Sequence, residues 1–485
     1  MKRLLVILIV CFSVTQSFAA KDALKDNPRV AEAIQLLEIW LQAERDYEEI
    51  PGLSIAVVHD QELVWSQGFG FADLGENRPI TAKTIYSICS ISKLFTSIAV
   101  LQLRDKGLLD LDDPVSKHLP WFQIQEKHAD AGKATIRNIL THSSGLPRES
   151  AFPYWSAPDF EFPTQKEIME RVSEQATLYP ADTYFQYSNL GLTLAGEVVA
   201  AASGQSYEKY VMENILKPLG LQDTRPEMPE KLRGKALADG HSAKTRKGVR
   251  EEVPFFQANG VAAAAGYSST VEDLVKFASW QFRVLSGDDA DILQKNTLRE
   301  MQRVQWLDPN WRTSWGLGFA VWRSDNKTFV GHGGSCPGFR SQLLIMPKDK
   351  IAVAVASNAS GVNPRAYAQR AYEILAPVIS KASKAEKSES AEEEKPDFSK
   401  FTGIYNSQPW GGETAAIIWE GKLAMVGLPS SNPLSGMTKL KHIEDNRFRR
   451  IRNDDELGEE FIFQMNDAGE VVSLKRNSNI SRKLK

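Results

Sequence analysis

Cysteine and histidine are scarce in this sequence, with three cysteines and seven scattered histidines among 485 residues. No H-E-x-x-H pattern and no clustered set of ligands appears, so a zinc hydrolase is disfavoured. A G-x-x-x-x-G-K-[ST] loop and a G-x-S-x-G turn are also missing, which argues against a P-loop nucleotide site and against the α/β-hydrolase arrangement. We therefore expect no cofactor and no bound metal.

The sequence also lacks strong net charge and long apolar runs. The formal net charge is -3 and there is no basic stripe, so we expect no nucleic-acid partner. The apolar run Leu4–Val10 is too short for a good membrane span, and no other run approaches one. This run follows a basic start and precedes small residues up to Ala19, which is typical of a signal peptide over residues 1–19. We expect an exported protein, periplasmic or secreted, without a transmembrane span in its mature chain.

The few cysteines leave one question about oxidation open. Cys11 falls within the predicted signal peptide, where bulky Val10 disfavours a lipid-attachment site. Cys89 and Cys336 then remain in the mature chain. An exported protein can keep a disulfide, so the pair forms either a bridge or two small buried thiols.

The order of predicted elements indicates one main domain and one small domain. Strand-like segments occur early and again late in the main part, with helical segments and polar loops between about residues 108 and 300. One sheet assembled from both chain ends, with an inserted helical subdomain, explains this order. Residues 381–397 contain no large apolar residue and predict a charged linker. The predicted organisation is a signal peptide (1–19), a main domain (20–380), the linker (381–397) and a small antiparallel β domain (398–485).

Ser90 and Lys93 open the most apolar helical run of the chain, which ends before Gly107. At helical spacing their side chains share one face, about 5–6 Å apart at Cβ, so the amine can take the hydroxyl proton. Burial disfavours the ammonium and lowers the pKa of a lysine, as a lysine base at neutral pH requires. An S-x-x-K pair alone is weak evidence. It recurs at Ser324–Lys327, where Ser, Asp and Asn predict an ordinary hairpin turn.

Two further motifs strengthen the first. Tyr187-Ser188-Asn189 precedes a predicted helix, and a phenol beside a serine and a lysine can carry a proton to a leaving group. His332-Gly333-Gly334 ends a predicted strand, where glycines let a substrate backbone lie close to the strand.

With these three motifs in this order, the chain resembles the serine β-lactamase and penicillin-binding protein family. The nearest branch contains class C β-lactamases, esterases, D-aminopeptidases and D-alanyl-D-alanine carboxypeptidases. The resemblance covers about residues 28–380 and includes the loop 141–147. It implies an α/β fold with an antiparallel sheet flanked by helices and an all-helical subdomain, followed by a small all-β domain similar to a lipocalin-like barrel.

The resemblance also implies a role for each motif residue. The implied catalytic residues are the acylated nucleophile Ser90 and the proton carriers Lys93 and Tyr187. The implied substrate-binding residues are Asn189, His332, Gly333 and Gly334, and the implied oxyanion hole consists of the N–H groups of Ser90 and Ser335.

His332 departs from the family pattern, which has a lysine in the third motif. An ordinary histidine is mostly neutral at pH 7, so the site lacks a permanent positive charge for a substrate carboxylate. Arg340 either supplies that charge or is a surface strand residue, the interpretation the sequence favours. We expect an acyl-enzyme hydrolase that acts on a small molecule or peptide, for example one derived from the cell wall. The substrate is a D-amino-acid peptide, a small ester or, weakly, a β-lactam. The alternative is a penicillin-binding sensor that is acylated without turnover. The oligomeric state stays open.

Two other segments have an open role. His142 predicts a residue that braces a loop rather than one that takes part in catalysis. The aromatic segment 152–162 predicts either a lid over the cleft or a cap on the helical part.

Overall fold

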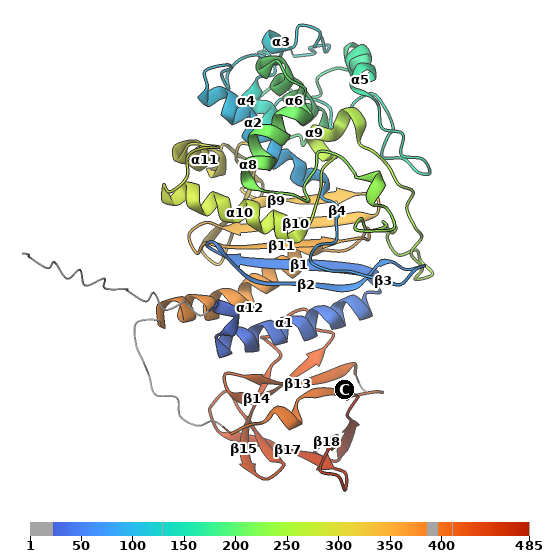
Figure 1. Ribbon diagram of the computed structural model, residues 1–485, viewed down its shortest axis with the longest axis vertical. Coiled ribbons are helices and arrows are strands. Elements are labelled where there is room, and N and C mark those ends of the chain that lie inside the picture. Colours follow the sequence, from blue (N-terminus) through green and yellow to red (C-terminus); the bar gives the residue numbers. More distant parts are fainter. Residues whose placement is uncertain (1–22, 129, 386–395, 410, 485) are drawn as a thin grey trace, which may run out of the picture.

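The structure is a computed structural model that describes residues 23–128, 130–385, 396–409 and 411–484. Within these ranges the chain forms a nine-stranded antiparallel sheet, a helical subdomain on one face of it and a separate eight-stranded sheet (Figure 1). The predicted fold class is confirmed. The predicted signal peptide, Cys11 and most of the predicted linker lie outside the described residues.

The large sheet joins the two ends of the main domain, as the order of predicted strands indicated. Strand β1 (Gly52–His59) pairs antiparallel with β11 (Ile351–Ser357) along its whole length. The strand order is β3-β2-β1-β11-β10-β9-β8-β7-β6. The other strands are β2 (Glu62–Asp73), β3 (Arg78–Pro79), β6 (Trp306–Leu307), β7 (Ser314–Trp315), β8 (Ala320–Ser324), β9 (Lys327–Cys336) and β10 (Phe339–Met346), and β4 (Tyr86–Ser87) pairs separately with β5 (Ser268–Ser269).

The second S-x-x-K sequence lies in the turn between β8 and β9. Asp325 and Asn326 have positive φ angles of 47° and 62°. Aspartate and asparagine tolerate this left-handed conformation better than other residues with a side chain, and two-residue hairpin turns require it. The segment is therefore the hairpin turn that the sequence predicted.

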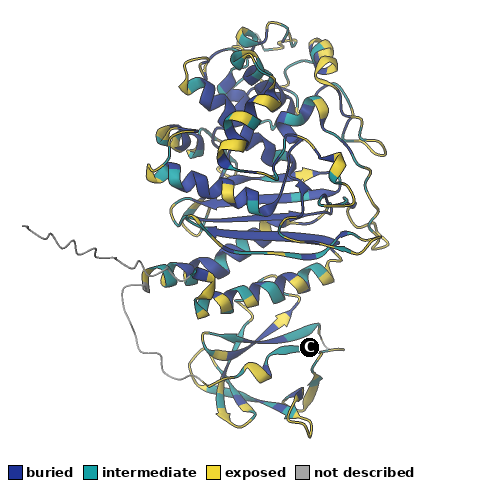
Figure 2. Ribbon diagram, viewed as in Figure 1, coloured by how far each residue is buried: buried dark blue, intermediate teal, exposed yellow. Residues whose placement is uncertain are grey.

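The two faces of the sheet carry different side chains because residues alternate along each strand. In β11, small alanines face the helical subdomain, where α10 (Val271–Ser286) lies against the sheet. The larger residues Ile351, Val353 and Val355 face the opposite layer, formed by α1 (Pro28–Tyr47) and α12 (Pro364–Ala385). Figure 2 shows the strands buried between these two layers.

The helical subdomain lies on the alanine-rich face. Ser90 belongs to a 3₁₀ turn, Cys89–Ile91, and the α-helix begins two residues after it, at Ser92. The helices of this part are α2 (Ser92–Asp105), α3 (Val115–His118), α4 (Ile136–Leu140), α5 (Gln165–Arg171), α6 (Asn189–Ser203), α7 (Tyr207–Val211), α8 (Lys217–Leu219), α9 (Ala262–Ala265), α10 and α11 (Lys295–Gln302).

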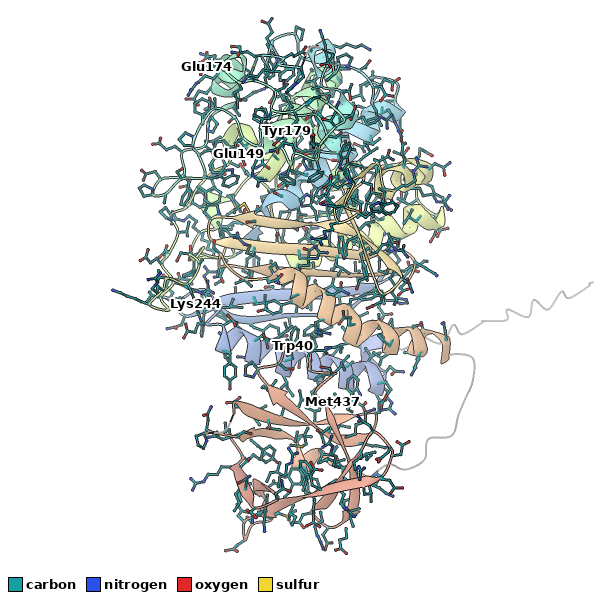
Figure 3. All side chains as sticks on the ribbon, turned by 180° about the vertical axis from the view of Figure 1, so that it is seen from behind. Trp40, Glu149, Glu174, Tyr179, Lys244 and Met437 are labelled. Carbon is teal, nitrogen blue, oxygen red and sulfur yellow. A yellow bond between two sulfur atoms is a disulfide. The ribbon has the colours of Figure 1, made fainter. Side chains whose placement is uncertain are left out.

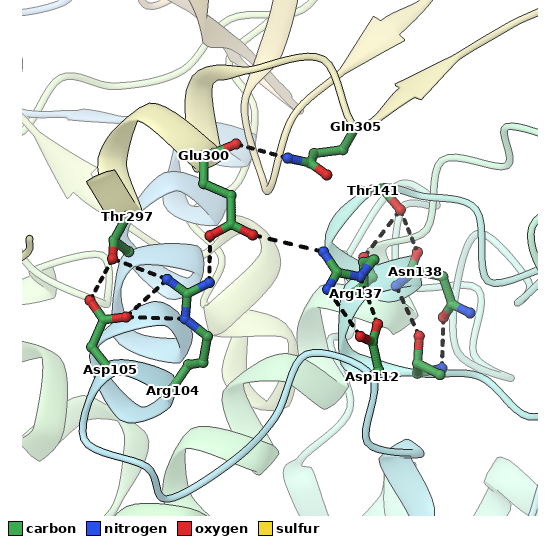
Figure 4. Close-up of polar contacts among 10 residues, drawn as sticks. Arg104, Asp105, Asp112, Arg137, Asn138, Thr141, Thr297, Glu300 and Gln305 are labelled. Carbon is green, nitrogen blue, oxygen red and sulfur yellow. Dashed lines mark hydrogen bonds and ion pairs between the residues drawn. The ribbon is translucent and has the colours of Figure 1, made fainter. Parts of the chain in front are cut away.

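An ion-pair network holds three of these helices together (Figure 4). Glu300 of α11 contacts Arg104 of α2 at 2.5 Å and Arg137 of α4 at 3.9 Å. Arg137 also pairs with Asp112 at 2.7 Å. Partly exposed ion pairs stabilise a fold only modestly. This network nevertheless fixes α4, which leads directly into the loop 141–147 beside the cleft.

Cys89 and Cys336 form a disulfide, with their Cα atoms 5.7 Å apart. Of the two alternatives left open by the sequence, the structure has the bridge. It joins the 3₁₀ turn that contains Ser90 to the end of β9.

The C-terminal domain is a meander of eight antiparallel strands. Its two edges approach each other, because Tyr405 in the first strand pairs with Lys483 after the last. A small core rich in phenylalanine fills the resulting near-barrel. Its strands are β12 (Gly403–Asn406), β13 (Glu413–Trp419), β14 (Lys422–Leu428), β15 (Thr438–Glu444), β16 (Arg447–Ile451), β17 (Leu457–Met465), β18 (Val471–Arg476) and β19 (Asn479–Arg482).

This near-barrel packs on α1, on the opposite side of the large sheet from the helical subdomain (Figures 1 and 3). The Trp40 indole donates to the carbonyl of Ser430 at 2.7 Å. Glu32 accepts the backbone N–H groups of Glu420 and Gly421 at 2.7 and 3.1 Å. The domain is therefore anchored to α1 and does not line the cleft of its own chain.

Helix α12 runs to Ala385, into the region where the sequence predicted the linker to begin. Residues 381–385 lack large apolar side chains, but lysine and alanine favour a helix once one has started. Among the described residues, no helix is both long and apolar enough to cross a membrane.

Candidate active site

The three predicted motifs meet at one cleft of about 540 Å³. The 3₁₀ turn contributes Ser90, and the end of β9 contributes the third motif. Asn189 is the first residue of α6, and Tyr187 lies two residues before it. The predicted residues that line the cleft are Ser90, Tyr187, Asn189, His332, Gly333 and Ser335. Another hollow of similar size, about 460 Å³, lies in the helical subdomain, but no S-x-x-K pair lines it.

Lys93 does not line the cleft itself but lies fully buried next to Ser90. Its Nζ is 3.2 Å from Ser90 Oγ, 2.7 Å from Asn189 Oδ1 and 2.8 Å from the carbonyl oxygen of Ala264. Burial lowers the pKa of Lys93 well below its usual value, an effect that Arg148 strengthens and Glu149 opposes. With a lowered pKa, Lys93 is present as the neutral amine to a larger extent at neutral pH.

The partners of Lys93 determine where a neutral amine directs its lone pair. The oxygens of Asn189 and Ala264 can only accept hydrogen bonds, so they take the two N–H groups of the amine. Ser90 is the one partner that can donate. The lone pair therefore faces the Ser90 hydroxyl, which is the arrangement that proton removal from a nucleophile requires.

Tyr187 lies next to this pair, among aromatic and charged side chains. Burial raises the pKa of Tyr187, and a hydrogen bond with Ser90 partly opposes the rise, so the phenol keeps its proton at neutral pH. Lys93 Nζ and the Arg148 guanidinium each lie 4.9 Å from the ring centroid. A protonated phenol beside the serine can act as a proton donor.

Glu149 fixes the orientation of Asn189. The amide nitrogen of Asn189 donates to both carboxylate oxygens of Glu149, at 2.8 and 3.0 Å. A carboxylate only accepts, so the amide oxygen must point the other way, toward Lys93. Tyr154 also donates to Glu149. The described hydrogen bonds of Asn189 thus position Lys93, and its contact with a substrate amide stays a prediction.

Two buried histidines flank Tyr187. Burial lowers the pKa of His332 to about 3, and that of His142 well below its usual value. His332 Nδ1 donates to its neighbouring carbonyl, at Gly333, at 2.6 Å. His142 Nδ1 accepts the N–H of Ser188 at 3.1 Å, so this residue braces the second motif. Both rings are neutral at pH 7, and the third motif carries no positive charge.

Gly334 has a different place from the one the sequence predicted. A Cβ at this position would lie 2.2 Å from the carbonyl oxygen of Ile88 and 2.1 Å from Ser341 Oγ. Glycine is required here because β9 packs tightly against the segment before Ser90. Gly334 does not line the cleft, whereas Gly333 does.

Several residues of the cleft were missed or left open by the sequence. Arg148 and Glu149 were not singled out from the sequence, and the signal that could have found them is their position directly after the loop 141–147. From the aromatic segment 152–162, Trp155 lines the cleft, whereas Tyr154 and Phe162 are buried in the helical part. Arg340, which the sequence favoured as a surface residue, also lines the cleft. Among the described residues, no group of three acidic, histidine or cysteine side chains could hold a metal ion.

Comparisons with known proteins show the family of this chain. The Beta-lactamase family model matches residues 40–377. Beta-lactamase-like protein 2 of Dictyostelium discoideum is 28% identical over 387 residues, covering 77% of this chain and 69% of that protein.

Two solved structures show the same architecture. An octameric penicillin-binding protein homologue from Pyrococcus abyssi has a TM-score of 0.63 and 24% identity, and the match covers 93% of this chain and 100% of that one. This likeness shows the fold. D-amino acid amidase from Ochrobactrum anthropi SV3, complexed with L-phenylalanine amide, has a TM-score of 0.58 and 25% identity, and the match covers 74% of this chain and 99% of that one.

Proposed function

Because the chain belongs to the Beta-lactamase family and is a serine hydrolase of that fold, we propose that it forms an acyl-enzyme at Ser90 and hydrolyses an amide or ester. The observation that carries this proposal is the set of partners around Lys93. Two oxygens that only accept leave Ser90 as the one group that can donate to the neutral amine.

The proposed reaction has two stages. Lys93 takes the Ser90 proton while Oγ attacks the substrate carbonyl, and the N–H groups of Ser90 and Ser335 stabilise the oxyanion. Tyr187 gives its proton to the leaving group, the carbonyl–leaving-group bond breaks, and Lys93 returns its proton to Tyr187. A water molecule then attacks the Ser90 ester with the same groups acting in reverse, which releases the acid and restores the hydroxyl.

The neutral third motif favours some substrates over others. With a pKa of about 3, His332 offers no cation to a substrate carboxylate at that position. Small esters and D-amino-acid amides, which carry no carboxylate on the leaving group, therefore suit the cleft better than β-lactams. The similarity to a D-amino acid amidase supports this choice.

Export is part of the same proposal. The N-terminal residues 1–19 have the pattern of a signal peptide. The Cys89–Cys336 disulfide supports this assignment, because such bonds persist mainly outside the reducing cytosol.

The test is a substrate panel of p-nitrophenyl esters, D-phenylalanine amide, D-alanyl-D-alanine peptides and a fluorescent penicillin, with Ser90→Ala as the control. We expect turnover of esters or D-amides, an acyl adduct on Ser90 by intact mass spectrometry, and no turnover by Ser90→Ala. Turnover by Ser90→Ala at the parental rate would rule out the mechanism. Stable penicillin labelling without turnover of any substrate would instead support the sensor alternative.

A further inference from the structure

Arg340 brings a positive charge to the cleft that no described carboxylate neutralises. It extends from β10, where it pairs with Ser335 of β9, and it lines the cleft together with Ser90. Its Nη1 donates to the carbonyls of Cys336 and Phe339, both at 3.2 Å. These are neutral acceptors, and the side chain is only half-buried. An arginine remains protonated in such surroundings.

The other ionisable groups of the cleft do not add to this charge. Arg148 Nε lies 3.1 Å from the carboxylate of Glu149, so that pair is neutral as a whole. His332 is uncharged at neutral pH. The net charge that a substrate meets in the cleft is therefore positive and located at Arg340.

The position of Arg340 indicates which part of the substrate meets this charge. His332 lies beside Tyr187, with ring centroids 6.2 Å apart, and Tyr187 serves the leaving group in the proposed reaction. Arg340 pairs with Ser335, three residues farther along β9 and therefore about 10 Å from His332 along the strand. The leaving group thus belongs at the His332 end of the cleft, and the acyl group at the Arg340 end.

We propose that Arg340 binds a carboxylate on the acyl part of the substrate. The enzyme then prefers acyl groups that end in a carboxylate over neutral acyl groups of equal length. This inference rests on the proposed acyl-enzyme function. A guanidinium forms strong charge-assisted hydrogen bonds with a carboxylate, and partial burial reduces the screening of their attraction by salt.

The test uses two esters that differ only at the end of the acyl chain, the p-nitrophenyl monoester of glutaric acid and p-nitrophenyl pentanoate. We expect kcat/KM to be about 10–100-fold higher for the glutarate ester, mainly through KM, as a hydrogen-bonded charge pair would give. The neighbouring carboxylate accelerates spontaneous hydrolysis of the glutarate ester. Rates measured with Ser90→Ala are therefore subtracted for both esters.

Two arginine variants make the test specific. Arg340→Gln should abolish the preference for the glutarate ester, and Arg340→Lys should keep part of it. Arg312→Gln is the matched control. It removes an exposed arginine that does not line the cleft, and it should retain the ratio between the two esters.

A third ester identifies the side on which the carboxylate binds. In 3-carboxyphenyl pentanoate the carboxylate is on the leaving group, and phenyl pentanoate is its neutral counterpart. A preference for this carboxylate that Arg340→Gln removes would overturn the assignment to the acyl side. Equal turnover of glutarate and pentanoate esters, or a glutarate preference that survives in Arg340→Gln, would overturn the inference and leave the proposed function intact. Absence of any Ser90-dependent turnover would overturn both.

Discussion

Both faces of the large sheet cover an apolar core, but the helical face also buries the ionisable groups of the cleft. On the helical side, next to the cleft, Lys93, His142 and His332 are buried with their pKa values lowered. On the other side, α1 and α12 pack against the sheet with apolar residues, and that core continues into the near-barrel. Burying groups that would rather be charged in water costs stability, whereas burying apolar surface provides it. The comparison indicates that the apolar cores on both faces stabilise the fold, and that the near face also carries buried groups that support the chemistry at a cost in stability.

The variant Lys93→Met should give the largest effect, a loss of activity without a loss of folding stability. We expect kcat/KM for an ester to fall about 10²–10⁴-fold, because the base is lost. The free energy of unfolding should stay equal or increase, because methionine fills the space without a buried amine. Ester kinetics and urea unfolding measure the two effects.

Lys106→Met is the control for this variant, since Lys106 is an exposed residue directly after α2. It should change neither quantity. Undiminished turnover by Lys93→Met would contradict the role of the amine.

The opposite result is expected for Leu37→Ala on the far face. Leu37 is fully buried in α1, so the truncation should lower the free energy of unfolding by about 2–5 kcal/mol. The kcat of the folded protein should not change. Urea unfolding, and kinetics well below the midpoint of unfolding, test this. Leu63→Ala removes a leucine that is 45% exposed and should cost about 0.5 kcal/mol or less. A Leu37→Ala protein that is stable but inactive would break the division between the two faces.

Lowering the pH should reduce the free energy of unfolding, because His332 and His142 are buried on the near face in their neutral form. The pKa of His332 is about 3 in the folded protein, against about 6.5 for an ordinary histidine. Between these values the unfolded chain binds a proton that the folded chain does not, so stability falls as the pH falls from about 6.5. We expect a loss of about 1.4 kcal/mol per pH unit for each such histidine, and His142 adds to it in the same direction. Urea unfolding between about pH 6.5 and pH 5 measures the slope, and His332→Gln should reduce it. An unchanged slope in that variant would argue against a neutral His332.

Trp40→Phe should produce the smallest effect, at the junction between α1 and the near-barrel. The change removes the hydrogen bond to the Ser430 carbonyl and keeps an aromatic ring beside Tyr367. We expect the free energy of unfolding to fall by about 1 kcal/mol, with unchanged ester kinetics. A change in kcat would show that the near-barrel communicates with the cleft through α1.

The sequence predicted the fold class, the main strands and the motif residues, because each of these has a local signal. The alternating Ile351–Ala356 segment predicted β11, and the two faces of that strand follow from the same alternation. Asn27 and Pro28 predicted the start of α1, which the structure confirms. Ser269 and Glu272 have the spacing of a capping box and predict Ser269 as the N-cap of α10. The N-cap is the next residue, Thr270, whose hydroxyl accepts the N–H of Asp273.

Features that depend on tertiary contacts could not be predicted in this way. The local sequence around Glu149 does not show that its carboxylate orients Asn189, because Glu149 and Asn189 are 40 positions apart in the chain. Gly334 predicted that a substrate backbone lies close to the strand at this position. The space next to its Cα is instead filled by the carbonyl of Ile88, which is far away in the sequence. The pKa of His332 depends on complete burial, which the sequence of a strand end does not reveal.

The disulfide between Cys89 and Cys336 joins two residues that are 247 positions apart, and so closes a covalent ring around the whole helical subdomain. A protease that cuts a loop inside this ring cannot release a fragment, because both pieces stay attached through sulfur. Nicked and intact chains would therefore separate on a denaturing gel only after reduction.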